Sequence, residues 1–313
     1  EAEVVVSRDH ATALQPGQHS ETLSQKKKKK EKKKKEKKKK EKKREETERQ
    51  NSIATSENAS ADTNNDGGAL RILYETVPGR VLLRLLSARW VSRVCGAFLD
   101  SRLSVPMIKG FAERSGINMQ DYLEYDFSSF NEFFTRRIRP EMRPIAAEPS
   151  ILPSPCDGRL SVYRIHDGLV IPIKQSRYSI ADLLKDRTLA ERYRGGICLV
   201  FRLCVDNYHR YHYIDAGRQS VNIFISGRLH TVRPIALRNV PVFTENCREY
   251  TVMETENFGT VTEIEVGAML VGRIKNRLSS GSFSRGEEKG MFLYGGSTVI
   301  LLLEGGRAEI DRR

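Results

Sequence analysis

From Pro153 onward the chain is a series of short runs rich in β-branched and aromatic residues, and this texture limits its possible folds most strongly. Gly, Asn and Asp interrupt the runs, as expected for turns between strands. We predict strands over residues 159–166, 169–173, 197–205, 221–226, 250–255, 260–266 and 298–303, with a helical insert over 180–189. Because long helices do not alternate with these runs, the pattern favours a compact antiparallel β-sandwich or barrel over a doubly wound α/β fold.

Residues 70–150 have a helical texture instead. Between Val77 and Leu103 the apolar residues recur mostly at three- and four-residue steps, as in a helix with one apolar stripe. The stripe consists of Val81, Leu82, Leu85, Leu86, Val91, Val94, Cys95, Phe98 and Leu99. Core packing is the commoner cause of such a stripe, but its flanking arginines also fit a basic helix on a lipid surface. With shorter helices predicted over 105–115 and 128–137, the expected fold class is α+β.

Residues 1–69 are poor in large apolar residues and rich in Lys, Glu, Ser, Asn and Gln. Such a segment cannot bury enough surface to offset the entropy of ordering, so we predict a disordered tail. Its run from Lys26 to Arg44 holds 16 basic and three acidic residues, a net charge of +13, which equals that of the whole 313-residue chain. A solvated tail and a contact with anionic lipid both fit this run.

The rest of the chain carries 37 basic and 37 acidic side chains. This balance argues against a nucleic-acid-binding fold, and no nucleic acid partner is expected. No run of about 18 apolar residues predicts a transmembrane helix, although the chain does not begin with Met and a signal or anchor segment could have been removed. Five cysteines without a Cys-x-x-Cys pair indicate neither a disulfide framework nor a zinc site.

Three clusters combine reactive side chains with turn-forming residues. The Ser-Pro-Cys-Asp-Gly segment over 154–158 offers the carboxylate of Asp157, although an Asp-Gly pair is usually only a turn. The segment over 206–212 offers two imidazoles, His209 and His212, which suit proton transfer but could equally be ordinary core or surface histidines. The Tyr-Gly-Gly-Ser-Thr segment over 294–298 places Ser297 after two glycines, where the backbone either permits attack on a peptide carbonyl or forms a hairpin turn.

Together, Asp157, His212 and Ser297 supply a carboxylate, an imidazole and a hydroxyl, the three groups of an activated nucleophile. No third ligand at a recognisable spacing accompanies the histidine pair, so no metal site is predicted.

Five segments resemble motifs of the phosphatidylserine decarboxylase family and occur in the order that the family has. They are Phe-Asn-Glu-Phe-Phe-Thr-Arg-Arg over 130–137 with Arg-Pro-Ile over 143–145, Ser-Pro-x-Asp-Gly, Tyr-His-Arg-x-His, Val-Gly-Ala over 266–268 with Val-Gly over 271–272, and Lys-Gly-x-Phe over 289–292 before Gly-Gly-Ser-Thr. The likeness runs from about residue 70 to 304. The chain departs from the family in its lysine-rich tail, in Cys156 where a small residue is common, and over 213–215, where many members have a Pro-containing turn.

The resemblance implies an inactive precursor that cuts its own backbone between Gly296 and Ser297. His212, oriented by Asp157, would take the proton from Ser297 Oγ, which attacks the Gly296 carbonyl. Elimination of the resulting ester would leave a dehydroalanine, which would hydrolyse to a pyruvoyl group with loss of ammonia. This covalent pyruvate cofactor, derived from Ser297, would form a Schiff base with phosphatidylserine, release carbon dioxide and yield phosphatidylethanolamine.

The same resemblance assigns further roles. His209 would return a proton to carbon or hold the substrate. The large chain and a 17-residue small chain would stay associated through the strand that follows Ser297. Residues 70–313 would form the decarboxylase domain, with a helical, membrane-proximal part over 70–150 and a β-rich catalytic core over 151–313.

The expected partner is phosphatidylserine in a membrane, which the protein would meet as a peripheral membrane protein through the amphipathic stretch over 81–99. A homo-oligomer is compatible with the sequence, and the compartment is not indicated. Three alternatives stay open: a pyruvoyl decarboxylase of another serine phospholipid or of an amino acid, a serine hydrolase that uses Asp157, His212 and Ser297 on an external ester, and a non-enzymatic lipid-binding β module. The last two predict a single uncut chain.

Overall fold

The computed structural model describes residues 68–166, 169–173, 176–268, 273–295 and 297–309, all within one compact unit that spans Ala54–Arg313. The predicted disordered tail therefore lies outside the described residues, apart from positions 68 and 69. These two are helical, because the first described helix, α2 (Gly68–Glu75), begins two residues before the expected boundary. Helix ends are the part of a helix that a sequence pattern locates least well.

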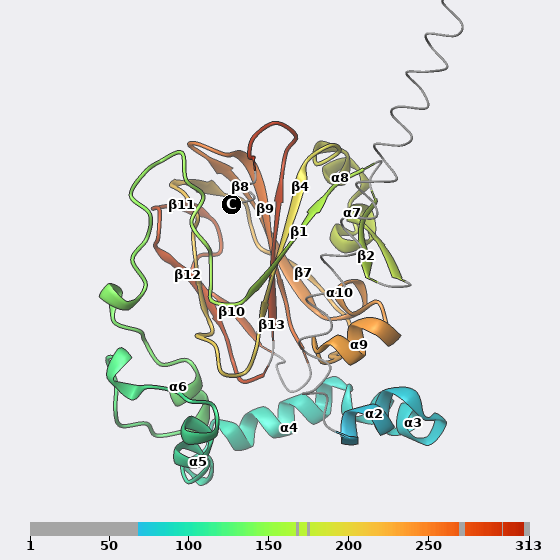
Figure 1. Cartoon of the computed structure of the whole chain (residues 1–313), viewed down its shortest axis with the longest axis vertical. Coiled ribbons are helices and arrows are strands. Elements are labelled where there is room, and N and C mark those ends of the chain that lie inside the picture. Colours follow the sequence, from blue (N-terminus) through green and yellow to red (C-terminus); the bar gives the residue numbers. More distant parts are fainter. Residues whose placement is uncertain (1–67, 167–168, 174–175, 269–272, 296, 310–313) are drawn as a thin grey trace, which may run out of the picture. The chain divides into compact units, whose positions relative to one another are not determined.

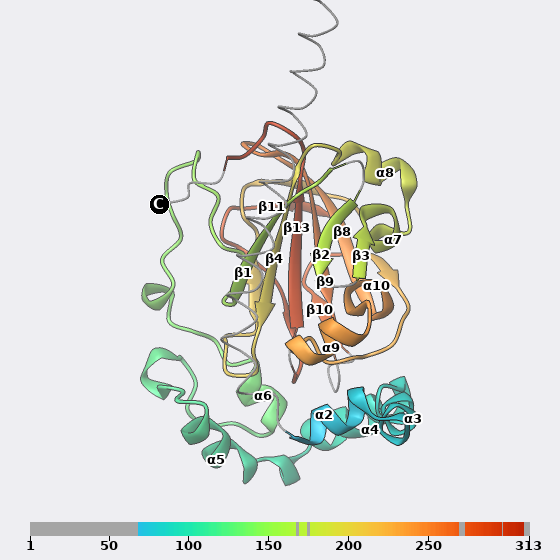
Figure 2. The ribbon, with the colours of Figure 1, turned by 45° about the vertical axis from the view of Figure 1, so that its right-hand side comes forward.

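An eight-stranded antiparallel sheet forms the centre of the described chain (Figure 1). Its strands are β1 (Arg159–Arg164), β4 (Ile197–Leu203), β6 (Gly217–Gln219), β7 (Ile223–Ile225), β8 (Arg248–Thr255), β9 (Gly259–Val266), β11 (Gly281–Phe283) and β13 (Ser297–Leu303). The order along the sheet is β1-β4-β13-β9-β8-β6-β11, with β7 also paired to β8. The last strand of the chain, β13, thus lies in the middle of the sheet, between β4 and β9 (Figures 1 and 2).

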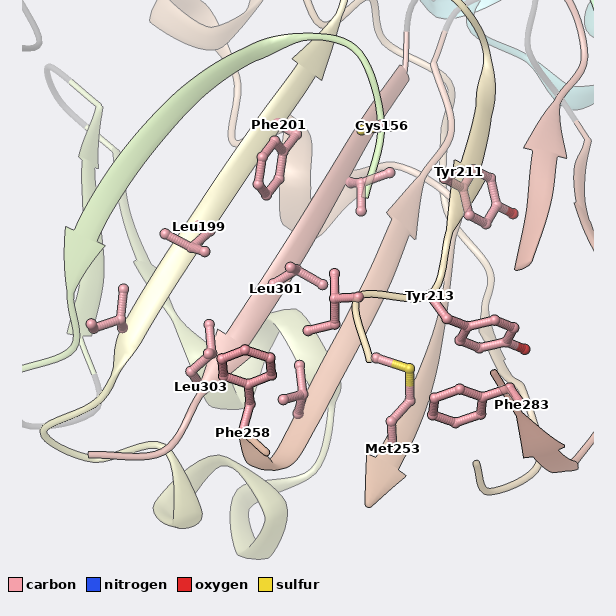
Figure 3. Close-up of a cluster of buried hydrophobic side chains, with 14 of the residues drawn as sticks. Cys156, Leu199, Phe201, Tyr211, Tyr213, Met253, Phe258, Phe283, Leu301 and Leu303 are labelled. Carbon is pink, nitrogen blue, oxygen red and sulfur yellow. The ribbon is translucent and has the colours of Figure 1, made fainter. Parts of the chain in front are cut away.

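One face of this sheet is covered by a second, three-stranded sheet of β10 (Ile274–Asn276), β12 (Glu288–Phe292) and β5 (Arg210–His212). Between the two sheets lies a hydrophobic cluster that we call the intersheet core (Figure 3). Its buried members are Cys156, Ile197, Leu199, Phe201, Leu203, Tyr211, Tyr213, Ile214, Met253, Phe258, Val261, Phe283, Phe292, Val299, Leu301 and Leu303.

The opposite face of the large sheet packs against short helices. They are α7 (Ile180–Leu184), α8 (Arg187–Arg192) and α10 (Val242–Glu245), next to a small ribbon of β2 (Leu169–Ile173) and β3 (Ser176–Ser179). We call the apolar cluster on this face the helical core; among its members are Ile180, Leu183, Leu184, Tyr193, Val200, Phe243, Ile264, Val266, Ile300 and Leu302. Because successive residues of a strand point to opposite faces, β13 sends Ile300 and Leu302 into the helical core and Val299 and Leu301 into the intersheet core.

Within the described residues, four further α-helices follow α2 and precede the sheets. These are α3 (Val77–Leu86), α4 (Arg89–Leu99), α5 (Met107–Arg114) and α6 (Phe130–Phe134). Tyr74 of α2 and Leu83 of α3 pack against Ile235 of α9 (Pro234–Asn239). Leu99, at the end of α4, packs against the phenylalanines of α6. The helical part is thus attached to the sheets by two small apolar clusters.

The predicted α+β class and the antiparallel sheets are confirmed. The helix expected between Val77 and Leu103 is wrong as a single element, because Ala88 adopts an extended conformation (ψ 141°) and separates α3 from α4. The insert predicted over 180–189 is also two helices, since Lys185 has a left-handed conformation and the Asp186 side chain caps α8 by accepting from the Leu189 N–H at 2.9 Å. The helix expected over 128–137 is confined to five residues of α6.

Candidate active site

Three sequence clusters meet at one end of the large sheet. Ser297, the first residue of β13, pairs with Leu203 of β4, and Thr298 pairs with Val266 of β9. Since Arg159 of β1 pairs with Arg202, the same register brings Gly158 next to Leu203. The Asp-Gly turn therefore lies two strands from Ser297, roughly 10 Å across the sheet. The histidine segment reaches the same place, because the His212 N–H donates to the Pro155 carbonyl at 2.8 Å.

Ser297 is fully buried, and its hydroxyl has no hydrogen-bond partner among the described residues. By strand alternation its side chain faces the same side of β13 as Val299 and Leu301, toward the layer that contains β5 and β12. Gly295 has φ 124°, a conformation that favours glycine. Gly296, the other residue of the predicted cleavage site, lies outside the described residues. The serine is thus a buried, unpartnered hydroxyl at the start of a central strand.

His209 is the histidine whose ring the structure places beside the chain that leads to Ser297. Its Nδ1 lies 2.8 Å from the Asn207 carbonyl oxygen, so Nδ1 carries the proton and Nε2 is left with a lone pair and no partner among the described residues. Burial lowers the pKa of His209 to about 3, although the carbonyls of Asn207 and Gly295 act in the opposite direction. His209 is therefore a neutral, buried imidazole next to the Gly295 carbonyl.

A buried arginine reinforces this neutral state. The Arg136 guanidinium lies 4.1 Å from the centroid of the Tyr122 ring and donates to the Tyr122 hydroxyl at 2.9 Å. Its positive charge lowers the pKa of His209 further. Burial lowers the pKa of Arg136 as well, but an arginine stays protonated at neutral pH.

His212 occupies a different environment. It is three residues after His209, so in an extended chain the two side chains point to opposite sides, and Tyr211 between them packs in the intersheet core. The His212 ring is half-buried and stacks on Tyr208, with 6.3 Å between ring centroids. Burial lowers the pKa of His212 below its ordinary value of 6.5, opposed by the charge of Glu288 and by the Pro155 carbonyl. This imidazole, too, is neutral at pH 7 and able to accept a proton.

Asp157 lies close by but has a partner that the sequence did not indicate. Both of its carboxylate oxygens accept from Arg143, at 2.8 Å from Nε and 2.9 Å from the terminal nitrogen. Within the described part of the chain no hydrogen bond joins Asp157 to His212, or either of them to Ser297. The three residues are gathered at the same end of the sheet, whereas the expected hydrogen-bonded chain between them is not formed in this state.

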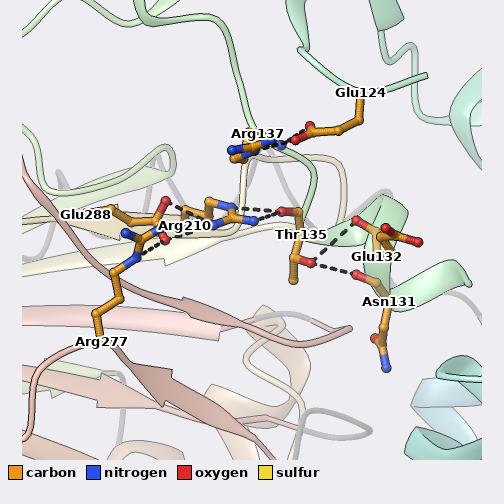
Figure 4. A network of polar contacts seen from close by, with 8 residues as sticks. All are labelled: Glu124, Asn131, Glu132, Thr135, Arg137, Arg210, Arg277 and Glu288. Carbon is orange, nitrogen blue, oxygen red and sulfur yellow. Dashed lines mark hydrogen bonds and ion pairs between the residues drawn. The ribbon is translucent and has the colours of Figure 1, made fainter. Parts of the chain in front are cut away.

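The segment over 130–137 clamps the site from outside. Asn131 accepts from the Tyr294 N–H at 3.1 Å, three residues before Ser297, and donates to Asp100 at 2.8 Å. One turn later, the Thr135 carbonyl accepts from Arg210, which lies between the two histidines and is also bound to Glu288 at 2.8 Å (Figure 4). One short helix thus holds both the segment before Ser297 and the histidine strand.

Sequence reasoning identified the reactive side chains but missed Asn131, Arg143 and Arg210 as the residues that position them. The motifs that contain these residues were recognised, but the sequence does not show which group an amide or a guanidinium will bind. The described residues contain no cluster of three or more His, Cys, Asp or Glu that could hold a metal ion. No described helix is long and apolar enough to cross a membrane.

Comparison with known proteins gives one consistent result. The family model described as phosphatidylserine decarboxylase matches residues 130–312. Phosphatidylserine decarboxylase proenzyme 2 of Clostridium acetobutylicum is 46% identical over 238 residues, which cover 76% of this chain and 81% of that protein. The phosphatidylserine decarboxylase proenzyme of Ruminiclostridium cellulolyticum is 41% identical over 251 residues, 78% of this chain and 84% of that protein. That of Clostridium perfringens (strain ATCC 13124) is 41% identical over 244 residues, with 76% and 83% covered.

Proposed function

The chain belongs to the phosphatidylserine decarboxylase family, and from this premise we propose which of its residues prepare and carry out the decarboxylation. The protein is a phosphatidylserine decarboxylase, a carboxy-lyase. The observation that supports our assignment best is Ser297: a buried hydroxyl without a partner, at the first position of the central strand, after a glycine with positive φ.

We propose that Ser297 is converted into a pyruvoyl group, which the site is suited to contain. A hydroxyl buried without a hydrogen bond is costly in a merely structural role, and such a group in a native protein calls for a functional explanation. A pyruvoyl group at this position would supply a carbonyl for condensation with the substrate amine and an electron sink for the loss of carbon dioxide. The surrounding chain excludes water from this position, since Gly295, Ser297 and Thr298 are all buried.

In the proposed self-cleavage His212 is the base, which requires its ring to turn toward Ser297, because in the described structure its neighbour Tyr211 is the residue that faces the intersheet core. Its neutral imidazole takes the proton of Ser297 Oγ, and the oxygen attacks the carbonyl carbon of Gly296. The bond from that carbon to the nitrogen of Ser297 breaks, and the nitrogen receives the proton, so an ester replaces the amide. Loss of the Ser297 Cα proton then expels the Gly296 carboxylate and leaves a dehydroalanine; this enamine tautomerises to an imine, and water displaces ammonia from the imine carbon to leave the pyruvoyl carbonyl. Asp157 orients His212 once the carboxylate has turned from Arg143.

His209 is proposed to act in the decarboxylation. Its ring lies near the Gly295 carbonyl, two residues before Ser297, and its Nε2 has no hydrogen-bond partner among the described residues. A neutral imidazole at this place can accept a proton and return it to carbon, or hold the substrate by a hydrogen bond. His209 lies just before β5 and His212 ends it, in different surroundings, so we assign the two steps to separate histidines.

The small chain is proposed to remain in place after the cut. β13 is paired with β4 along its whole length and with β9 from Thr298 to Leu303, and all its residues are buried. These hydrogen bonds and apolar contacts do not involve the cleaved bond, so the 17-residue chain that begins at Ser297 stays in the sheet.

Denaturing mass spectrometry of the purified protein tests the assignment. We expect two fragments, the smaller one lighter than its encoded mass because a ketone replaces the serine amine. Ser297→Ala should remain whole. His212→Ala should slow or abolish the cut, whereas His209→Ala should be cut and then fail to release carbon dioxide from phosphatidylserine. An uncut but fully active wild-type protein would refute the proposal, and normal cleavage of His212→Ala would refute the role of that residue.

We also propose that α3 and α4 attach the protein to the bilayer as a peripheral membrane protein. Val81, Trp90 and Val94 expose 58%, 61% and 62% of their surface, beside the exposed Arg80 and Arg84. Large exposed apolar side chains flanked by arginines suit a helix that lies in a lipid interface. In co-sedimentation with phosphatidylserine-containing vesicles, the double variant that carries both Trp90→Glu and Val94→Glu should lose most of its binding. Thr188→Glu on α8 is the control and should bind normally; equal binding of both variants would exclude this surface.

A further inference from the structure

A cavity of about 440 Å³ lies between α4 and the segment that precedes Ser297. It is lined by Ser92, Arg93, Gly96, Ala97, Leu99 and Asp100 on one side and by Asn131, Phe224, Leu229, Cys247, Arg273, Leu293 and Tyr294 on the other. The cavity is close to the reactive position: the Gly267 N–H donates to the Cys247 carbonyl at 2.9 Å, and the register of β9 and β13 brings Gly267 next to Ser297. Cys247 is therefore two strands, roughly 10 Å, from Ser297.

The polar groups of this cavity are suited to an anion. Arg93 and Arg273 are exposed at its rim. Arg273 lies 3.6 Å from Asp100, but with 72% of its side chain exposed this pair is weak, and the guanidinium can turn to a ligand at little cost. In contrast, Ser92 is 4% exposed, and its buried hydroxyl has no hydrogen-bond partner in the described chain. A buried hydroxyl that lines a cavity without a partner indicates a polar ligand that satisfies it.

Helix α4 connects the cavity to the exposed apolar surface. Ser92, Gly96 and Leu99 line the cavity at steps of four and three residues, so they form one face of the helix. Trp90, Val94 and Phe98, at steps of four, form another face and are exposed. A lipid could therefore keep its acyl chains in the bilayer beside the exposed face of α4 and extend its polar head around the helix into the cavity.

We infer that the cavity binds the phosphodiester of the substrate, with Arg93 and Arg273 as its cationic ligands and Ser92 as a hydrogen-bond donor. This inference rests on the proposed function, because it requires a substrate amine to react at position 297. In phosphatidylserine the phosphate is bonded to the side-chain oxygen of the serine head, only a few bonds from the amine. Because only four bonds join the phosphorus to the amine nitrogen, the phosphodiester must occupy the end of the cavity nearest residue 297, which Tyr294 lines.

Steady-state decarboxylation in mixed micelles tests this inference, with the surface fraction of phosphatidylserine as the variable. Arg273→Gln and Ser92→Ala should cut themselves to completion, as seen by mass spectrometry, because neither side chain contacts the residues assigned to the cut. Arg273→Gln should raise KM roughly tenfold, the effect of one lost charge-assisted hydrogen bond, with a smaller change in kcat. Arg273→Lys should recover part of the loss, and Arg187→Gln on α8 is the matched control with unchanged KM.

Soluble competitors separate phosphate recognition from a general effect on the fold. Glycerophosphoserine should inhibit the wild type, and this inhibition should weaken roughly tenfold in Arg273→Gln. Inhibition by serine methyl ester, which has no phosphate, should be the same in both proteins. Unchanged KM in both Arg273→Gln and Ser92→Ala, or an equal loss of inhibition by both competitors, would overturn the inference. A wild type that cuts itself but releases no carbon dioxide would instead refute the proposed function, and the inference with it.

Discussion

The two faces of the eight-stranded sheet are built from the same strands but differ in chemistry. On β9, Ile264 and Val266 enter the helical core, whereas Glu263 and Glu265, at the alternate positions, are fully buried beneath the three-stranded sheet. Lys289 of β12 is buried there as well and donates to Glu265. By strand alternation, Ser297 belongs to this charged face too. The helical face thus serves mainly stability, while the intersheet face combines a core with buried charges and the reactive residue.

The buried Lys289–Glu265 pair provides the strongest test of this difference. Lys289→Met should destabilise the protein by about 3–5 kcal/mol, because it leaves Glu265 without its counter-charge in a buried place. The unfolding free energy can be measured in urea on the uncut Ser297→Ala background, so that a single chain is followed. Adding Glu265→Leu should recover most of the loss, since the uncompensated charge is then gone. If the double variant were as unstable as Lys289→Met, packing and not charge would explain the effect.

On the helical face a comparable loss should come from packing alone. Leu302→Ala removes buried methyl groups from the centre of the helical core and should cost about 2–5 kcal/mol. Because no titrating group is involved, the loss should be the same at pH 5 and at pH 9 in urea denaturation. A loss that changes with pH would mean that the two faces are coupled through the strand.

The charged face should also give the protein a particular pH dependence. Burial raises the pKa of Glu263 from 4.5 to about 8, opposed by the charge of Lys289. The folded state therefore binds this proton more tightly than the unfolded state. Its contribution to stability is fully present below about pH 4.5 and is lost as pH rises through about 8. In thermal melts of the Ser297→Ala background, the melting temperature should fall between pH 5 and pH 9, and Glu263→Gln should reduce that fall.

Another glutamate serves as the control for this pH effect. Glu256 is exposed in the turn between β8 and β9, so Glu256→Gln should leave the slope of melting temperature against pH as it is. If both variants had the slope of the parent protein, Glu263 would have to titrate at its ordinary value, and the charged face would contribute nothing to the pH dependence.

Sequence patterns predicted the central strands of the large sheet better than the three-stranded sheet. The strands with apolar runs, such as β4 and β13, were expected within two residues of their observed ends, because a continuous apolar run is a local signal. In contrast, β12 has the sequence Glu-Lys-Gly-Met-Phe and was not predicted as a strand. Its lysine is buried only because Glu265, from a distant part of the chain, is there to receive it. The burial of Glu263 and Glu265 could not be predicted from the sequence for the same reason.

The active site shows the same limit. The identities of Asp157, His209, His212 and Ser297 as candidates came from residue chemistry and from the family motifs. Their arrangement did not: nothing local in the sequence indicates that Asp157 binds Arg143, or that His209 contacts the Asn207 carbonyl while His212 stacks on Tyr208. These relations depend on register and on contacts between distant segments, which a single sequence does not encode in any short window.

The smallest expected effect concerns Thr298, which is next to Ser297 but, by strand alternation, points to the helical face of the sheet. Its hydroxyl is fully buried and has no hydrogen-bond partner among the described residues. If this hydroxyl has no part in the cut, Thr298→Val should raise the unfolding free energy by up to about 1 kcal/mol, because it replaces an unsatisfied hydroxyl with a methyl group of similar size. The rate of self-cleavage, followed by mass spectrometry after synthesis, should not change. Slower cleavage with unchanged or higher stability would show that the helical face also contributes a group to the chemistry. The division of roles between the two faces would then not hold at the start of β13.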